Sequence, residues 1–297
     1  MPIVATMKDV HHAYGRIPAL RGVNLAVRRG EVLAVLGPNG AGKTTGISLL
    51  LGLFPAQRGH VEVFGHAPSA RATRLRRGAM LQIAGLTPTL RVAEHIELFR
   101  SYYANPLPLA KLVKTAALDG LEQWPFGALS GGQQRRVMFA LALAGDPELV
   151  FLDEPTSGLD LEARRRLWGE IRRLAETGRT VVLTTHYLEE ADALADRIVV
   201  IHKGQAITEG TPAQIKARTA GRRLRCITTI TCDELRRRAD VATAAASGQH
   251  VEVLTSEPEE LLRWMLSADP KLRDLSVSGA GLEQAFLTLT EEAQDVA

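Results

Sequence analysis

The sequence predicts an α/β fold organised around a parallel sheet, and three observations support this class. Apolar or β-branched runs typical of buried strands occur at residues 32–36, 149–152 and 180–185. Residues 146–215 alternate between strand and helix patterns, as parallel strands joined by crossover helices do. The first run leads directly into a glycine-rich loop and a helix, which is the order of elements in a phosphate-binding site.

The glycine-rich loop fits the pattern G-x-x-x-x-G-K-[ST] at every position, as Gly37-Pro38-Asn39-Gly40-Ala41-Gly42-Lys43-Thr44. Its glycines let successive N–H groups converge on phosphate oxygens, and the helix that starts near Gly42 adds about half a positive charge there. Lys43 is expected to reach the β- and γ-phosphates, and Thr44 to hold Mg²⁺. An ordinary glycine-rich turn is the alternative, but pattern and context both argue against it.

The strand at residues 149–152 ends in two adjacent carboxylates, Asp153 and Glu154. A carboxylate at the end of a strand is placed to hold the Mg²⁺ shell, while its neighbour can orient or deprotonate an attacking water. The alternative is a solvated acidic turn before Pro155. The phosphate loop upstream favours the catalytic interpretation.

A second glycine element, Leu129-Ser130-Gly131-Gly132-Gln133, lies between the loop and the acidic strand end. A separate Ser-Gly-Gly element indicates a second anion site that the chain's own loop cannot use. The alternative is a capped helix start, with Ser130 as the N-cap of a helix that begins near Gln133. The two interpretations are compatible.

These elements, in this order, resemble the nucleotide-binding ATPase subunits of ATP-binding cassette (ABC) transporters over about residues 3–215. The resemblance implies a RecA-like P-loop NTPase core with an antiparallel β N-terminal part and a helical signature subdomain. The matching motifs are an adenine-stacking Tyr14, the Walker A loop at 37–45, the Q-loop Gln82, the signature at 130–133, the Walker B pair Asp153 and Glu154, the D-loop at 157–160 and the switch histidine His186.

The resemblance also implies the ligands, ATP and Mg²⁺, and the residues that hold them. The implied catalytic residues are Lys43, Gln82, Glu154 and His186, and the implied metal ligands are Thr44, Gln82 and Asp153. The implied nucleotide contacts are Tyr14, Gly37, Pro38, Asn39, Gly40, Ala41, Gly42, Lys43, Thr44, Thr45, Ser130, Gly131, Gly132, Gln133 and Asp160. Without the family resemblance, Gln82 could simply be a polar residue at the end of a strand. A single aromatic residue near the N-terminus, such as Tyr14, would not by itself indicate an adenine contact.

The family resemblance implies a head-to-tail dimer, in which ATP on one chain's loop is covered by Ser130, Gly131 and Gly132 of the other chain. Glycine lets the backbone approach the γ-phosphate closely, and the helix N-terminus points its positive end at the same anion. The dimer would be a homodimer or include a related ATPase subunit. It would act on an integral membrane permease at the cytoplasmic face of the inner (plasma) membrane, and no nucleic acid partner is expected.

Three segments resemble drug- and antibiotic-exporter ATPases in particular, namely residues 185–191, 209–212 and 281–290. This resemblance implies export. Two departures from the family pattern stand out: Gly46 lies in the first turns of the Walker A helix, and residues 121–128 are short and apolar where relatives often carry basic residues. The second departure leaves the identity of the permease open.

Composition is compatible with such a subunit. The 297 residues, 45% of them hydrophobic, can form one large domain and one smaller one. The 36 basic and 33 acidic residues leave a net charge of +3, which is too balanced to indicate a nucleic acid partner. No apolar run approaches the roughly 18 residues that span a bilayer, and the N-terminus lacks a signal-peptide pattern. Cys226 and Cys232 fit neither a zinc nor a redox motif, so reduced thiols are expected.

The motifs divide the chain into an ATPase domain at residues 1–215, with a helical subdomain at about 83–145, and an α+β accessory domain at 216–297. The accessory domain is expected to alternate strand and helix, with strands at 224–231, 251–255 and 275–278 and a first helix at 233–239. A capping box, Ser256-x-x-Glu259, marks its second helix. Leu282, Phe286 and Leu289 give the last helix a buried face.

Two other functions are weighed against transport. A soluble ABC ATPase of DNA repair or translation usually has long coiled coils or a second cassette, and this sequence has neither a long heptad run nor a second Walker A loop. A P-loop kinase would leave the Ser-Gly-Gly element unexplained.

Overall fold

The computed structural model describes residues 2–82, 85–217 and 222–279, together with residues 282, 283, 285, 286, 289 and 290. The chain divides into two compact units, Met1–Thr211 and Pro212–Ala297. No helix among the described residues has the length and apolar character needed to cross a bilayer.

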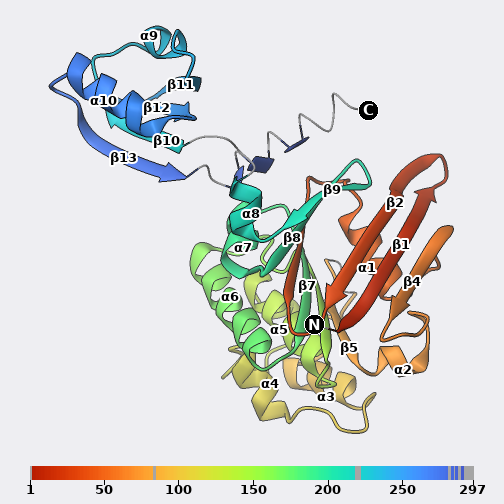
Figure 1. Ribbon diagram of the computed structural model, residues 1–297. Coiled ribbons are helices and arrows are strands. Elements are labelled where there is room, and N and C mark those ends of the chain that lie inside the picture. Colours follow the sequence, from red (N-terminus) through yellow and green to blue (C-terminus); the bar gives the residue numbers. More distant parts are fainter. Residues whose placement is uncertain are drawn as a thin grey trace. The chain divides into compact units, whose positions relative to one another are not determined.

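The centre of the first unit is a sheet with the strand order β5-β6-β7-β3-β8-β9 (Figure 1). Its strands are β5 (Arg77–Met80), β6 (Leu149–Asp153), β7 (Thr180–Thr185), β3 (Val32–Leu36), β8 (Arg197–His202) and β9 (Gln205–Gly210). All pairings are parallel except β8 with β9. Every residue of β3, β6 and β7 is buried, as expected for parallel strands covered on both faces. The predicted α/β class is therefore confirmed.

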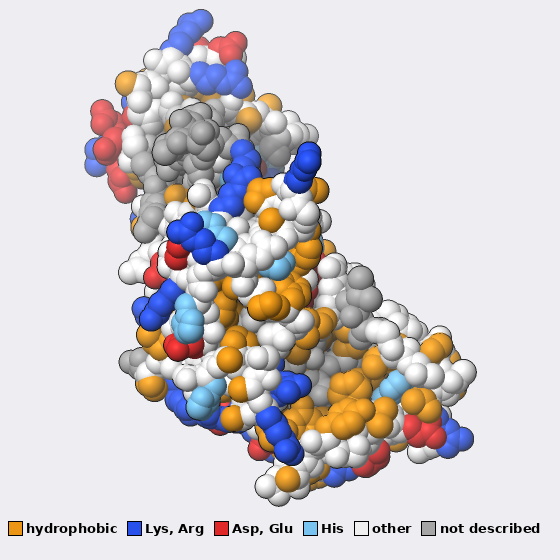
Figure 2. Space-filling view, turned by 90° about the vertical axis from the view of Figure 1, so that its right-hand side faces the viewer, with side chains coloured by type: hydrophobic (Ala, Val, Ile, Leu, Met, Phe, Trp, Pro, Cys, Tyr) orange, Lys and Arg blue, Asp and Glu red, His pale blue; other side chains and the backbone are white. Residues whose placement is uncertain are grey.

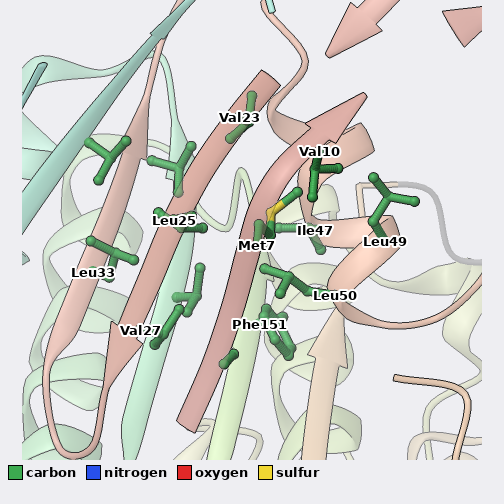
Figure 3. Close-up of a cluster of buried hydrophobic side chains, with 14 of the residues drawn as sticks. Met7, Val10, Val23, Leu25, Val27, Leu33, Ile47, Leu49, Leu50 and Phe151 are labelled. Atoms are coloured by element: carbon green, nitrogen blue, oxygen red, sulfur yellow. The ribbon is translucent and has the colours of Figure 1, made fainter. Parts of the chain in front are cut away.

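A second, antiparallel sheet has the order β2-β1-β4. Its strands are β1 (Ile3–Tyr14), β2 (Ile17–Arg28) and β4 (Arg58–Val63). The inward side chains of β1 and β2, such as Met7, Val10 and Leu25, pack with Ile47 and Leu50 of helix α1 (Lys43–Leu50) (Figure 3). This core supports α1 and, with it, the loop that precedes the helix.

Helices fill the chain between β5 and β6. They are α3 (Val92–Arg100), α4 (Leu109–Thr115), a 3₁₀ turn at Phe126–Ala128 and α5 (Gly131–Leu143), while the short α2 (Arg71–Arg74) precedes β5. Ile96 is fully buried, and Leu86, Leu90 and Phe99 are half-buried. These apolar positions therefore serve largely as core. In the sequence, helix α6 (Leu161–Glu176) precedes β7 and helix α7 (Leu188–Leu194) follows it.

The surface of the first unit also carries exposed hydrophobic side chains. Figure 2 shows such side chains gathered, rather than scattered singly, on the lower part of the face it presents. The large exposed hydrophobic residues that the structure describes in this unit are Ile3, Tyr14, Ile17, Leu53, Leu75, Leu98, Tyr102, Trp124 and Leu161.

The second unit is a small α+β structure. It begins with α8 (Pro212–Ala217) and continues as β10 (Arg222–Ile227), α9 (Cys232–Arg236), β11 (Val241–Ser247), β12 (His250–Thr255), α10 (Pro258–Ala268) and β13 (Arg273–Gly279). The four strands form an antiparallel sheet in the order β11-β12-β10-β13. Leu224, Cys226 and Val253 pack with Leu235 of α9 and Met265 of α10. Both cysteines are free thiols, as expected.

Some sequence expectations for this unit are wrong. Strand β11 was not expected, because its sequence is rich in alanine and carries only one Val and one Thr. The predicted capping box at Ser256 is absent: α10 starts at Pro258, its N-cap is Glu257, and no side chain caps it. Proline favours the first helical position because its φ is preset and it has no N–H to satisfy. Of the last predicted helix, Leu282 is buried and Phe286 and Leu289 are half-buried, while residues 281, 284, 287 and 288 lie outside the described residues.

Candidate functional site

The loop between β3 and α1 has a backbone that only glycine can follow at its critical points. Gly40 and Gly42 have positive φ angles of 79° and 104°. A Cβ on Gly37 would lie 2.3 Å from the carbonyl oxygen of Ile201, and one on Gly42 would lie 2.4 Å from that of Ala19. The loop therefore packs its backbone directly against neighbouring strands, and α1 begins at Lys43 with Gly42 as its N-cap.

The side chain of Lys43 is held in place by backbone oxygens of the same loop. Its Nζ donates to the carbonyl oxygens of Gly37 at 2.8 Å and Pro38 at 3.1 Å. The same Nζ lies 3.5 Å from Oε1 of Glu154, at the end of β6. The ammonium group thus stands between the loop and the acidic strand end.

Thr44 and Asp153, which the sequence assigns to the metal, lie in direct contact. Thr44 Oγ1 donates to the two carboxylate oxygens of Asp153 at 3.0 and 3.2 Å, and Thr184 Oγ1 of β7 donates to Oδ1. Asp153 is fully buried, and within the described ranges no basic side chain forms a salt bridge with it. A buried carboxylate is normally paired or metal-bound, and carboxylate and hydroxyl oxygens are ligands that Mg²⁺ accepts.

These two oxygen donors fit Mg²⁺ better than a metal that needs a full protein cage. Mg²⁺ is typically held by one or two carboxylates together with substrate phosphates and water. Among the residues that the structure describes, no three His, Cys, Asp or Glu side chains gather as a metal cluster. The donor set at Thr44 and Asp153 is therefore the kind that shares a cation with a bound phosphate.

Glu154 has an unusual backbone conformation, and its side chain lies close to Lys43 and His186. Its φ is 48°, and its N–H donates to the backbone oxygen and to Oγ1 of Thr184, each at 3.1 Å. Its Oε1 lies 3.1 Å from Nδ1 of His186, an ion-pair distance whose angles do not form a hydrogen bond. The carboxylate is therefore fixed between Lys43 and His186.

One cavity of about 360 Å³ lies at the phosphate loop and is lined by part of the predicted nucleotide site. It is lined by Tyr14, Ile17, Pro18, Ala19, Asn39, Gly40, Gly42, Lys43, Thr44, Thr45, Gln82 and Glu154. Tyr14 is 54% exposed, and its ring contacts His12 and Phe54 edge-on, with centroids 5.1 and 6.2 Å apart. The structure thus brings Tyr14 and Gln82 to the same cavity as the loop, although they are distant in sequence.

The Ser-Gly-Gly element lines a different cavity. Ser130 caps α5 through a reciprocal pair of bonds with Gln133, so the helix begins at Gly131, slightly earlier than expected. A cavity of about 210 Å³ is lined by Ser130, Gly132, Gln133, Arg136, Asp160, Glu162, Ala163 and Arg166. Asp160 caps α6 by accepting from the N–H of Ala163 at 2.8 Å. Within one chain, the loop and the Ser-Gly-Gly element therefore form separate sites.

The structure adds residues that the sequence reading missed. Thr184 holds both Asp153 and the backbone of Glu154, yet in the sequence it reads only as a strand residue. Arg135, one turn into α5, has its pKa lowered by burial, and the nearby carboxylates of Glu154 and Asp153 oppose that shift.

The first unit has a parallel sheet, a phosphate loop at the end of β3 and two carboxylates at the end of β6, and a lysine stands between the loop and the carboxylates. These features together define a P-loop nucleotide-binding ATPase. Comparison with known proteins gives the family. The family model described as "ABC transporter" matches residues 20–157.

Relatives of known name match over nearly the whole chain. The Nod factor export ATP-binding protein I of Ralstonia nicotianae is 34% identical, and the match covers 97% of this chain and 94% of the relative. The daunorubicin resistance ATP-binding protein DrrA3 of Streptomyces coeruleorubidus is 38% identical, with 98% and 90% covered. The chain belongs to the ATP-binding subunits of ABC transporters, and it is an ATPase of that family.

A solved structure matches the first unit in size. An ATP-binding cassette, determined as a dimer in a post-hydrolysis state with ADP and Pi, is 28% identical with a TM-score of 0.65. The match covers 70% of this chain and 98% of that chain. The neighbour is thus matched over nearly its whole length, and about a third of this chain lies outside the match.

Proposed function

We propose that this chain hydrolyses ATP as one half of a head-to-tail dimer and thereby drives export through a separate membrane permease. The observation that carries the proposal is the separation of the loop cavity from the cavity at Ser130. Each of the two cavities holds part of an ATP site. In the dimer, a second copy is rotated so that its Ser130 meets the loop of the first copy, and two complete ATP sites result. The names of the relatives, a Nod factor exporter subunit and a daunorubicin resistance subunit, support export.

In this proposal the loop residues Gly37, Pro38, Asn39, Gly40, Ala41, Gly42, Lys43, Thr44 and Thr45 bind the phosphates, and Tyr14 stacks on adenine. Gly40 and Gly42 allow the backbone N–H groups to face the anion. Ser130, Gly131, Gly132, Gln133 and Asp160 contact the nucleotide of the other chain. Ser130 already caps α5, so its hydroxyl lies at the positive end of that helix.

Thr44 and Asp153 are the proposed Mg²⁺ ligands, with Gln82 at the edge of the same cavity. The cation would neutralise charge on the β- and γ-phosphates. Glu154 acts as the base that orients and deprotonates the attacking water, and His186 and Lys43 stabilise the charge around it. The proximity of Glu154 to His186 and Lys43, at 3.1 and 3.5 Å, supports this assignment.

The two domains have different roles in this proposal. We assign ATP binding and hydrolysis to residues 1–215, with the signature in a helical subdomain at about 83–145, and an accessory role to residues 216–297. The gathered exposed hydrophobic side chains in Figure 2 support a protein partner for the first domain, because such patches mark interaction sites. An integral permease is that partner, which places the chain at the cytoplasmic face of the inner membrane.

The test is replacement of the base. Glu154→Gln should lower the rate of ATP hydrolysis by roughly 10² to 10⁴ while ATP affinity is retained, because the amide cannot take a proton from water. Steady-state phosphate release and ATP titration measure the two quantities. Glu189→Gln, an exposed glutamate on α7, is the matched control and should hydrolyse ATP at the wild-type rate. Normal turnover by Glu154→Gln would refute the assignment of the base.

A further inference from the structure

A buried carboxyl group outside the predicted site contacts several of the segments that form it. Glu190 lies on α7 and is fully buried. Its Oε1 accepts a hydrogen bond from Thr156 Oγ1 at 2.8 Å and another from Trp168 Nε1 at 3.0 Å. Thr156 belongs to the turn after β6, and Trp168 belongs to α6. Three separate segments therefore meet at one oxygen atom.

Each of these segments carries a group of the ATP site. Thr156 follows Glu154 by two positions, in the turn that leaves β6. Helix α7, with Glu190 in its first turn, begins two residues after His186. Helix α6, which carries Trp168, starts at its N-cap Asp160. Moving any one of the segments relative to the others would change the geometry at the end of β6.

The contact that depends most on this geometry is the one between Glu154 and His186. Their side chains meet at 3.1 Å, yet they come from the ends of two different strands. On the β7 side, the backbone of Glu154 is tied to Thr184 by two bonds. On the other side, the turn that follows Glu154 is tied to α7 through Thr156 and Glu190, and Arg172 of α6 also donates to the backbone oxygen of Ala193 in α7.

Glu190 offers an acceptor rather than an exposed charge. Burial raises the pKa of Glu190, and the hydroxyls of Thr185 and Thr156, the Trp168 indole and the Arg164 guanidinium oppose that shift. Its second oxygen, Oε2, is buried without a hydrogen-bond partner in the described part of the chain. A protonated carboxyl and an amide both retain the carbonyl oxygen that two donors share here. The two donors that meet at Oε1 need an accepting oxygen, which a carboxylate, a protonated carboxyl and an amide all supply.

We propose that Glu190 is a positioning residue for ATP hydrolysis, which holds Thr156, Trp168 and α7 together and so sets Glu154 against His186. The inference rests on the function proposed above for those two residues. Glu190 acts through them, since it lines neither of the two cavities described for the nucleotide.

The test compares two substitutions at this position in the full-length protein. Glu190→Ala removes the acceptor, and its kcat should fall about 10- to 100-fold, the usual cost of a small misplacement of catalytic groups. The KM for ATP should stay within about twofold, because the loop and Tyr14 are untouched. Glu190→Gln keeps the accepting oxygen and should retain most of the wild-type kcat.

Trp168 supplies a readout that is independent of turnover. In a Trp124→Phe, Trp264→Phe background, the tryptophan emission comes from Trp168 alone and responds to the surroundings of its indole, including the hydrogen bond to Glu190. Glu190→Ala should shift this emission, and Glu190→Gln should leave it close to that of the parent. Thr156→Val is a milder second variant: it keeps the size of the side chain and removes one donor, and it should lower kcat several-fold with KM unchanged. It provides the test if Glu190→Ala does not fold.

Glu189→Ala, at the neighbouring exposed position, is the control and should match the wild type. The inference is overturned if Glu190→Ala, or Thr156→Val in its place, keeps the wild-type kcat. It is also overturned if Glu190→Gln loses as much activity as Glu190→Ala, because charge would then be the required property. Glu154→Gln, measured in parallel, separates the two proposals: normal turnover there contradicts the proposed function, whereas normal turnover in Glu190→Ala contradicts only the positioning role.

Discussion

At the scale of single residues, Gly42 shows how tightly the loop is constrained. Its φ of 104° is unfavourable for any other residue, and a Cβ would lie 2.4 Å from the oxygen of Ala19 and 2.8 Å from Cδ2 of Leu20. We expect Gly42→Ala to weaken ATP binding by at least about tenfold, because backbone strain of this kind costs on the order of 1–3 kcal/mol and shifts the loop. Titration with a fluorescent ATP analogue measures the affinity.

Gly46 is the natural control for that substitution. It lies in α1, one turn further on, where a Cβ would meet no atom within 4 Å. Gly46→Ala should therefore raise stability by about 0.5–1 kcal/mol, because alanine restricts the unfolded chain and favours helix. Thermal unfolding of both variants distinguishes them. Equal ATP affinity in Gly42→Ala and Gly46→Ala would contradict the steric argument.

The same scale shows what the sequence could and could not predict. Lys43, Thr44 and Asp153 were found because their types and spacing follow from the chemistry of phosphate and Mg²⁺. The structure brings Thr44 into contact with Asp153, and Lys43 to within 3.5 Å of Glu154. Their roles remain predictions. Thr184 and Glu190 were not found, because each acts through a three-dimensional contact with a residue about 30 positions away, and nothing in the local pattern separates them from ordinary strand and helix residues.

At the scale of elements, predictability followed the strength of the pattern. Strands β3, β6 and β7 were predicted within a residue or so, because they are buried on both faces and bounded by turn residues. Strand β11 was missed because alanine has little preference for strands, although it forms a hairpin with β12, the next strand along the chain. The start of α10 was misplaced because Pro258, rather than Ser256, sets it.

The turn that follows α10 gives a prediction for the second unit. Asp269 accepts hydrogen bonds from Thr228 Oγ1, from the N–H of Thr229 and from the N–H of Lys271. These bonds lower the pKa of Asp269 from 3.8 to about 2. A depressed pKa means that the carboxylate stabilises the fold above pH 3.8 and that this contribution is lost as pH falls toward about 2.

Asp269→Ala should accordingly lower the melting temperature of the second unit's transition by several degrees at pH 7. The difference from the wild type should shrink as pH falls below 3.8. Differential scanning calorimetry at several pH values measures this, with Asp233→Ala, an exposed residue on α9, as control. A destabilisation that stays constant down to pH 2 would show that the carboxylate charge contributes nothing.

At the scale of the whole molecule, the separation of the two cavities leads to a test of the head-to-tail arrangement. Lys43→Ala disables the loop but leaves the signature, and Ser130→Arg blocks the signature but leaves the loop. In a head-to-tail dimer each ATP site takes its loop from one chain and its signature from the other. A mixed dimer of the two variants then contains one site in which both parts are intact.

Each variant alone should be inactive, and an equal mixture should recover about a quarter of the wild-type hydrolysis per chain, since half of the dimers are mixed and each has one working site. ATP-dependent dimer formation, followed by light scattering, should reappear in the mixture together with hydrolysis. A mixture that neither dimerises nor hydrolyses ATP would contradict the arrangement. It would mean that the loop and the Ser130 element of one chain must act on the same nucleotide, which the separate cavities of the structure argue against.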